Sequence, residues 1–113
     1  MNLKHVNNLT TTDDIAAIAA AQPVLGDFGF DMELPLSKNA SFLAQVDAAR
    51  RYILCVPNAG VEMVGRGAYY LKHQAEQHAR TYVSVGALIV GAMLEGLKPV
   101  RDKYGPNCRF AKT

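Results

Sequence analysis

The chain of 113 residues has no tryptophan and only two cysteines, and neither cysteine belongs to a recognisable motif. Cys55 and Cys108 stand far apart, outside any CxxC or Cys/His spacing, so a disulfide framework or a zinc site is not indicated. The longest apolar run, residues 82–97, is shorter than the roughly 20 residues that span a bilayer. The first residues lack the apolar core of a signal peptide, so we expect a cytoplasmic protein.

Catalytic and metal-binding motifs are missing as well. His73 and His78 are five residues apart and would point about 140° away from each other on a helix, whereas a metal pair uses i, i+4 spacing. The glycines of residues 60–67 are spaced like those of a phosphate loop, but no Lys-Ser/Thr follows them, and a flexible linker or turn explains them more simply. We therefore expect no metal, no cofactor and no enzyme. A third functional hypothesis, after protein binding and nucleic-acid binding, is a small-molecule-binding protein or enzyme with its pocket near Gly60–Gly67.

Charge is unevenly divided along the chain. Residues 1–49 have two lysines against six acidic residues, a balance of −4, and residues 50–113 have ten Lys or Arg against four acidic residues, a balance of +6. Half of all residues are hydrophobic, which argues against disorder. The length fits a single globular domain spanning residues 1–113.

The segment from Tyr82 to Leu97 predicts the centre of the fold. Apart from Ser84 and Glu95, every residue in it is apolar, Gly or Tyr, so a helix here would be buried on nearly all sides. Ser84 is a natural N-cap and Gly96 a natural helix stop. We predict a buried central helix over about residues 85–95, with a flat spot at Ala87 and Gly91 where a neighbouring helix can approach.

Helices and strands are predicted on both sides of this segment. Apolar residues at helical spacing, with capping residues before them, predict a helix that begins after Thr11 or Thr12 and ends before Pro23, a second from Ser37 or Asn39 to about residue 54, and a third over about residues 68–79. Period-two alternation predicts a half-buried strand over residues 27–34, and residues 97–101 and 108–111 predict a C-terminal β-hairpin. The predicted fold is α+β: three or four helices around the central helix, with a small antiparallel sheet that includes the hairpin.

Two charged surfaces are candidate protein-binding sites. The predicted strand has an acidic face and the hairpin is basic, so we expect the two to be attractive neighbours. Charge would steer a partner, while buried aromatic residues would supply most of the affinity. A solvated face is the alternative interpretation of the acidic residues. The acidic candidates are Asp27, Asp31 and Glu33, and the basic candidates are Arg101, Lys103 and Arg109 together with Tyr104.

Sequence-independent nucleic-acid binding by the basic second half is the alternative function. Phosphate contacts need only positive charge, and salt dependence would reveal them. A winged helix-turn-helix is disfavoured, because residues 85–94 offer no polar side chains to read bases. The candidate phosphate-binding residues are Arg50, Arg51, Arg66 and Lys72.

The oligomeric state is left open by the sequence. Tyr69 and Tyr70 belong either to the core or to an interface between copies, so a homo-oligomer is possible.

The C-terminal part of the chain resembles the ends of small phage and prophage proteins. The resemblance covers about a quarter of the chain, from Tyr82 to Phe110, and lies in Ser84, residues 86–89, Gly96, Arg101 and residues 106–110. It implies a compact, non-catalytic protein that inhibits a host defence or regulatory protein by stoichiometric binding in the host cytoplasm.

Overall fold

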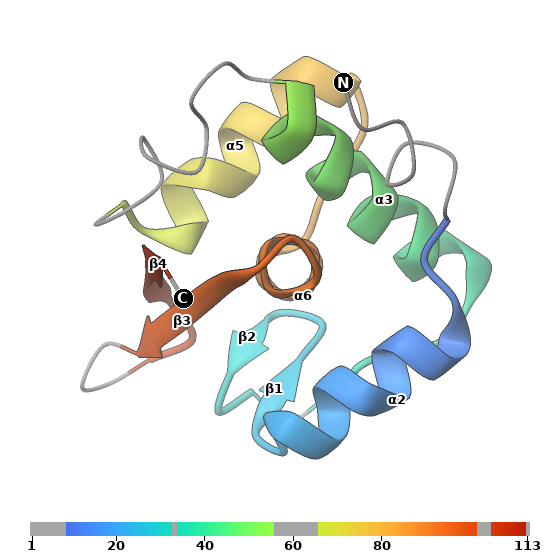
Figure 1. The fold of residues 1–113 in the computed structure, drawn as a ribbon, viewed down its shortest axis with the longest axis vertical. Helices are drawn as coiled ribbons and strands as arrows, with labels where there is room; N and C mark the ends of the chain where they lie inside the picture. The colour runs from blue at the N-terminus through green and yellow to red at the C-terminus, as the bar shows by residue number, and fades with distance from the viewer. Residues whose placement is uncertain (1–8, 33, 56–65, 102–104, 113) are drawn as a thin grey trace.

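Helix α6 (Val85–Leu94) lies at the centre of the computed structural model, seen end-on in Figure 1 with the other elements around it. The structure describes residues 9–32, 34–55, 66–101 and 105–112. All residues from Val85 to Ala92 are buried. The Ser84 hydroxyl accepts a hydrogen bond from the Ala87 amide at 3.1 Å, and Gly96 has a φ of 92°. The predicted central helix, its N-cap and its glycine stop are confirmed.

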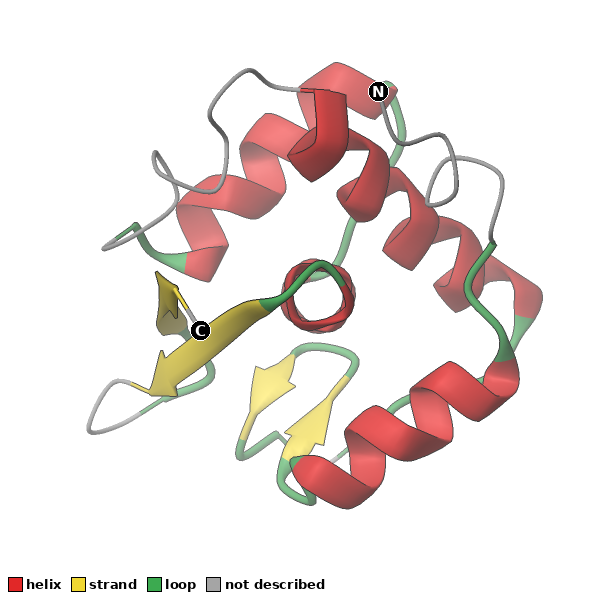
Figure 2. Ribbon diagram, viewed as in Figure 1, coloured by secondary structure: helices red, strands yellow, loops and turns green. Residues whose placement is uncertain are grey.

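Three helices and two hairpins surround α6 in the described part of the chain (Figure 2). This is the predicted small α+β domain, and the C-terminal hairpin has the predicted bounds to within one residue. The surrounding elements are α2 (Thr12–Ala21), β1 (Leu25–Gly26), β2 (Gly29–Phe30), α3 (Ala40–Cys55), α5 (Ala68–Ala79), β3 (Leu97–Arg101) and β4 (Cys108–Lys112).

The predicted caps form at the starts of α2 and α3. Thr11 and Asp14 make a capping box: the Asp14 amide donates to Thr11 Oγ1 at 3.2 Å, and the Thr11 amide donates to Asp14 Oδ2 at 2.9 Å. At the start of α3, Asn39 Oδ1 accepts from the Phe42 amide at 2.8 Å. Both helices therefore begin where a short polar side chain satisfies a free backbone amide.

Two glycines of α6 allow neighbouring elements to approach its backbone. A Cβ at Gly91 would lie 2.9 Å from the Ala49 Cβ of α3, which confirms a flat spot on this face. A Cβ at Gly86 would lie 2.0 Å from the Gly26 carbonyl oxygen, because the turn between β1 and β2 rests directly on α6. The Gly86 amide donates to the Asp27 carbonyl oxygen at 3.0 Å. Both the long helix and the first hairpin are thus fixed to the central helix.

The single strand predicted over residues 27–34 is wrong. The chain instead folds back on itself, and β1 pairs with β2 in antiparallel register over two residues each. Positive φ angles at Gly29 (109°) and Asp31 (62°) turn the backbone away from extended geometry. Phe30 is fully buried, while Phe28 and Met32 are exposed.

The C-terminal hairpin is regular and packs one face on the core. Pro99 pairs with Phe110, and Arg101 pairs with Cys108. Cys108 and Phe110 are buried, as alternation along β4 requires when one face is covered. In the described part of the chain, no helix has the length and apolar composition needed to cross a membrane.

Candidate functional site

Five large, half-exposed side chains lie on neighbouring parts of α5, of the segment before α6, and of the first hairpin with the residues after it. Their exposed fractions run from 43% to 57%. A single exposed apolar side chain is ordinary on a protein surface, but several that lie together are informative. We call this set the aromatic surface; it consists of Phe28, Met32, Leu34, Tyr69 and Tyr82.

Lys72 connects the two tyrosines of the aromatic surface. Its ammonium group lies 5.6 Å from the centre of the Tyr69 ring and 5.2 Å from the centre of the Tyr82 ring. These distances are within the range of a cation–π contact. The Lys72 Nζ also lies 3.2 Å from Glu76 Oε1. Lys72 was a candidate for phosphate contact, but it is 7% exposed, because two rings and a carboxylate enclose its charge.

Glu76 connects α5 to the segment before α6. Its carboxylate accepts from the Val83 amide at 3.1 Å, and its Oε1 lies 3.1 Å from His73 Nδ1. Burial alone would raise the pKa of Glu76. The hydrogen bonds from Val83 and Lys72, with the positive charges of Lys72 and His73, outweigh burial and hold the pKa of Glu76 below its ordinary value. The carboxylate therefore stays charged and keeps the end of α5 tied to the start of the next segment.

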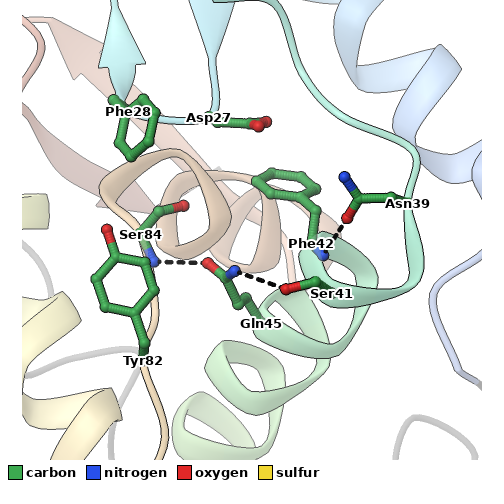
Figure 3. A pocket seen from close by; sticks show the side chains of 8 residues that line it. All are labelled: Asp27, Phe28, Asn39, Ser41, Phe42, Gln45, Tyr82 and Ser84. Carbon is green, nitrogen blue, oxygen red and sulfur yellow. Dashed lines mark hydrogen bonds between the residues drawn. The ribbon is translucent and has the colours of Figure 1, made fainter.

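A pocket of about 130 Å³ opens beside Tyr82 and Phe28, at the N-terminal ends of α3 and α6 (Figure 3). Its aromatic members are Phe28, Phe42 and Tyr82, and Phe42 is buried. The polar members come from three separate parts of the chain. They are Asp27, Asn39, Ser41, Gln45 and Ser84.

Hydrogen bonds within the protein fix the polar side chains of the pocket. Gln45 Oε1 accepts from the Ser84 amide at 3.0 Å, and Gln45 Nε2 donates to Ser41 Oγ at 3.5 Å (Figure 3). Asn39 Oδ1 accepts from the Phe42 amide at 2.8 Å. The lining is therefore pre-formed and joined to the backbone of both helices.

A second, open hollow of about 390 Å³ continues from the pocket along the first hairpin. Phe28 lines both hollows, and the second also includes Asp31, Met32 and Leu34. Tyr69, Tyr82, Phe28 and the residues of this hollow are thus linked one to the next by shared contacts. The aromatic surface is continuous.

The predicted charged residues flank this surface in part. Asp31 forms an ion pair with Arg101, which confirms that the acidic segment and the basic hairpin are neighbours. The Arg101 guanidinium also lies 4.7 Å from the centre of the Phe30 ring. The Asp27 carboxylate accepts from the Ser37 amide at 2.7 Å and from the Ser37 hydroxyl. Asp31 and Arg101 therefore face each other across the hairpins.

The other charged candidates are placed differently. Arg109 is exposed on β4, and Glu33, Lys103 and Tyr104 lie outside the described residues. So does most of the glycine-rich stretch from Gly60 to Gly67, the expected place of a small-molecule pocket. In the described ranges, no group of three or more His, Cys, Asp or Glu residues is arranged to hold a metal ion.

The basic residues considered for phosphate contact do not form one surface. Arg50 is 6% exposed, and its Nε lies 2.9 Å from Glu95 Oε2 inside the fold. Lys72 is enclosed as described above. Arg51 and Arg66 are exposed, and the Arg66 guanidinium lies 5.2 Å from the centre of the Tyr70 ring.

Sequence reasoning missed the pocket, because its lining comes from residues 27–28, 39–45 and 82–84 and no local motif marks it. The one available signal was that a polar residue precedes each of the two helices. Ser84 was predicted as a cap and Asn39 as one of two possible helix starts, and the caps of two helices that meet side by side bring polar groups together.

Comparisons with known proteins leave the geometry as the guide to function. No protein-family model matches the chain, and neither the curated proteins nor the solved structures give a match.

Proposed function

We propose that this protein is a non-enzymatic binding protein that forms a stoichiometric complex with another protein through the aromatic surface. The observation that carries the proposal is the continuity of this surface: five half-exposed apolar or aromatic side chains joined by two hollows and a shared lysine. Large contiguous apolar patches on a small domain are typical of protein interfaces. Tyrosine and other aromatic residues supply much of the affinity there.

The charged residues have a secondary role in this proposal. Asp31 and Arg101 border the second hollow as an ion pair, so they would orient a partner at the rim of the interface. Arg109 pairs with Val100 and therefore lies on the opposite face of the hairpin from Arg101, outside this rim. The resemblance to phage proteins suggests that the partner is a host defence or regulatory protein, which would make this chain its inhibitor.

Affinity capture from host lysate, with and without nuclease, tests the proposal. The wild type is compared with Tyr82→Ala, which removes the ring shared by the pocket and the Lys72 contact. Tyr70→Ala is the matched control, because Tyr70 is also a half-exposed tyrosine next to Tyr69 on α5 but lies outside the aromatic surface. We expect one protein partner that survives nuclease, is kept by the control, and binds Tyr82→Ala at least about 30-fold more weakly, as for an interface hot spot.

The same capture distinguishes the alternatives. Equal retention by Tyr82→Ala and the wild type would contradict an interface on the aromatic surface. Recovery of nucleic acid alone, with all associated proteins lost after nuclease, would contradict protein binding and favour phosphate contact by Arg51 and Arg66.

A further inference from the structure

The pocket between Phe28 and Tyr82 has an unequal set of hydrogen-bonding groups. The side-chain oxygens of Asn39, Gln45 and Ser41 each accept a hydrogen bond from within the protein. The Asn39 Nδ2 group and the hydroxyls of Ser41 and Tyr82 donate to no group in the described part of the chain. Besides the carboxylate of Asp27, the pocket therefore offers donors, and these suit a ligand that brings hydrogen-bond acceptors.

The charge of the pocket opposes an anionic ligand. Asp27 lines it, and its carboxylate accepts from the uncharged amide and hydroxyl of Ser37 without a cation among the described residues. Lys72, which contacts the Tyr82 ring, is already compensated by Glu76. A carboxylate or phosphate would meet this uncompensated negative charge, whereas a neutral carbonyl would accept the same hydrogen bonds without repulsion.

The walls and the volume define the rest of the ligand. Phe28, Phe42 and Tyr82 supply aromatic walls around about 130 Å³. This is slightly less than the roughly 150 Å³ of a cavity that holds a benzene ring. One apolar side chain of the size of leucine therefore fits between these walls, and a phenyl ring enters in part because the pocket is open to solvent, with the backbone of either residue near the donors at the rim.

We propose that the pocket receives a single apolar side chain from a segment of the partner protein that carries no negative charge, and that Asn39 and Ser41 donate to the backbone carbonyls beside it. The identity of the ligand as a protein segment depends on the proposed function. The selectivity for a neutral acceptor over an anion does not, because it follows from the lining alone.

Titration with three small probes tests this inference by ¹⁵N-detected spectra of the whole chain, in which the side-chain NH₂ groups of Asn39 and Gln45 are directly visible. The probes are N-acetylphenylalaninamide, N-acetylphenylalanine as its carboxylate, and N-acetylglycinamide. We expect the first to shift both side-chain signals saturably, on the order of millimolar affinity for so small a ligand. The carboxylate should bind at least about 5-fold more weakly, and the glycine probe should leave the signals unchanged.

Two variants identify the pocket as the place of binding. Phe28→Ala removes an exposed wall without disturbing the core and should weaken binding of the neutral probe at least about 5-fold. Tyr70→Ala should bind it like the wild type. Equal or stronger binding of the carboxylate, no saturable shift with any probe, or equal binding by Phe28→Ala would each overturn the inference. A capture partner that still depends on Tyr82 would then leave the proposed function standing, so the two failures are distinguishable.

Discussion

Replacing Glu95 by glutamine tests how much the buried ion pair between Arg50 and Glu95 contributes to the stability of the fold. The Arg50 and Glu95 side chains are 7% and 4% exposed, and Arg50 Nε lies 2.9 Å from Glu95 Oε2. Arg50 also donates from Nη1 to Thr10 Oγ1 at 2.7 Å, and the same nitrogen lies 3.5 Å from Asp47 Oδ1. Glu95→Gln would remove a negative charge that faces a buried guanidinium.

The magnitude follows from the partners that Arg50 retains. Removing one member of a buried ion pair costs about 3–5 kcal/mol, since the other charge remains buried. Thr10 and Asp47 still contact the guanidinium, so we expect the lower end, about 3 kcal/mol of unfolding free energy. At about 2.1 cal/mol/K of unfolding entropy per residue, a chain of 113 residues would lose about 13 °C in Tm. Its total stability, roughly 6–17 kcal/mol by size, leaves the variant folded.

Denaturant unfolding followed by circular dichroism measures this change, with thermal unfolding as the second readout. Arg51→Gln is the matched control, because Arg51 follows Arg50 on α3 but is exposed and should change stability by less than about 0.5 kcal/mol. A loss below about 1 kcal/mol for Glu95→Gln would refute the reasoning, since it would mean that the guanidinium is not buried against this carboxylate in solution.

Two further predictions concern α6 and the aromatic surface. Gly86→Ala should cost about 3 kcal/mol or more in denaturant unfolding, because its Cβ would meet the Gly26 carbonyl oxygen at 2.0 Å. Gly91→Ala should cost less, about 1–2 kcal/mol, because the Ala49 Cβ at 2.9 Å and the Val46 carbonyl oxygen at 3.2 Å require a smaller shift, which the helix propensity of alanine partly offsets. Equal losses would contradict this. Folding lowers the pKa of Glu76, so the carboxylate contributes stability above its unfolded pKa of about 4.3, and this contribution is lost as pH falls through the folded pKa. Between pH 7 and pH 3, the free energy of unfolding of the wild type should therefore converge on that of Glu76→Gln. A difference between the two proteins that stays constant with pH would exclude this contribution of the Glu76 charge.

The central helix was predictable because its composition allows one environment. From Val85 to Ala92 every side chain is apolar or absent, so burial did not depend on knowing the neighbours. The stops were equally local: Ser84 can cap its own helix and Gly96 can adopt a positive φ without strain. Features set by a few adjacent residues were readable from the sequence alone.

The buried charges and the first hairpin depend on partners that are distant in sequence. Arg50 is buried because it forms an ion pair with Glu95, which is 45 residues away in the sequence. The spacing of apolar residues along the helices would place both charged residues on the surface. The alternation of residues 27–34 mimics a strand, but Asp31 adopts a left-handed φ and pairs with Arg101, which is 70 residues away. Such positions become visible when the tertiary contacts are known.

The start of the central helix α6 holds both sides of the pocket in place. The Ser84 amide donates to Gln45, and the Gly86 amide donates to the Asp27 carbonyl, so both sides of the pocket are bonded to the start of α6. The backbones beside Phe28 and Gln45 are therefore fixed before a partner arrives, and binding would order little more than the exposed rings. Each immobilised side chain costs about 0.5–1.5 kcal/mol, whereas a loop would cost more. Because Gly86 sets this contact, a substitution there should weaken partner binding together with stability, while Phe28→Ala should weaken binding alone.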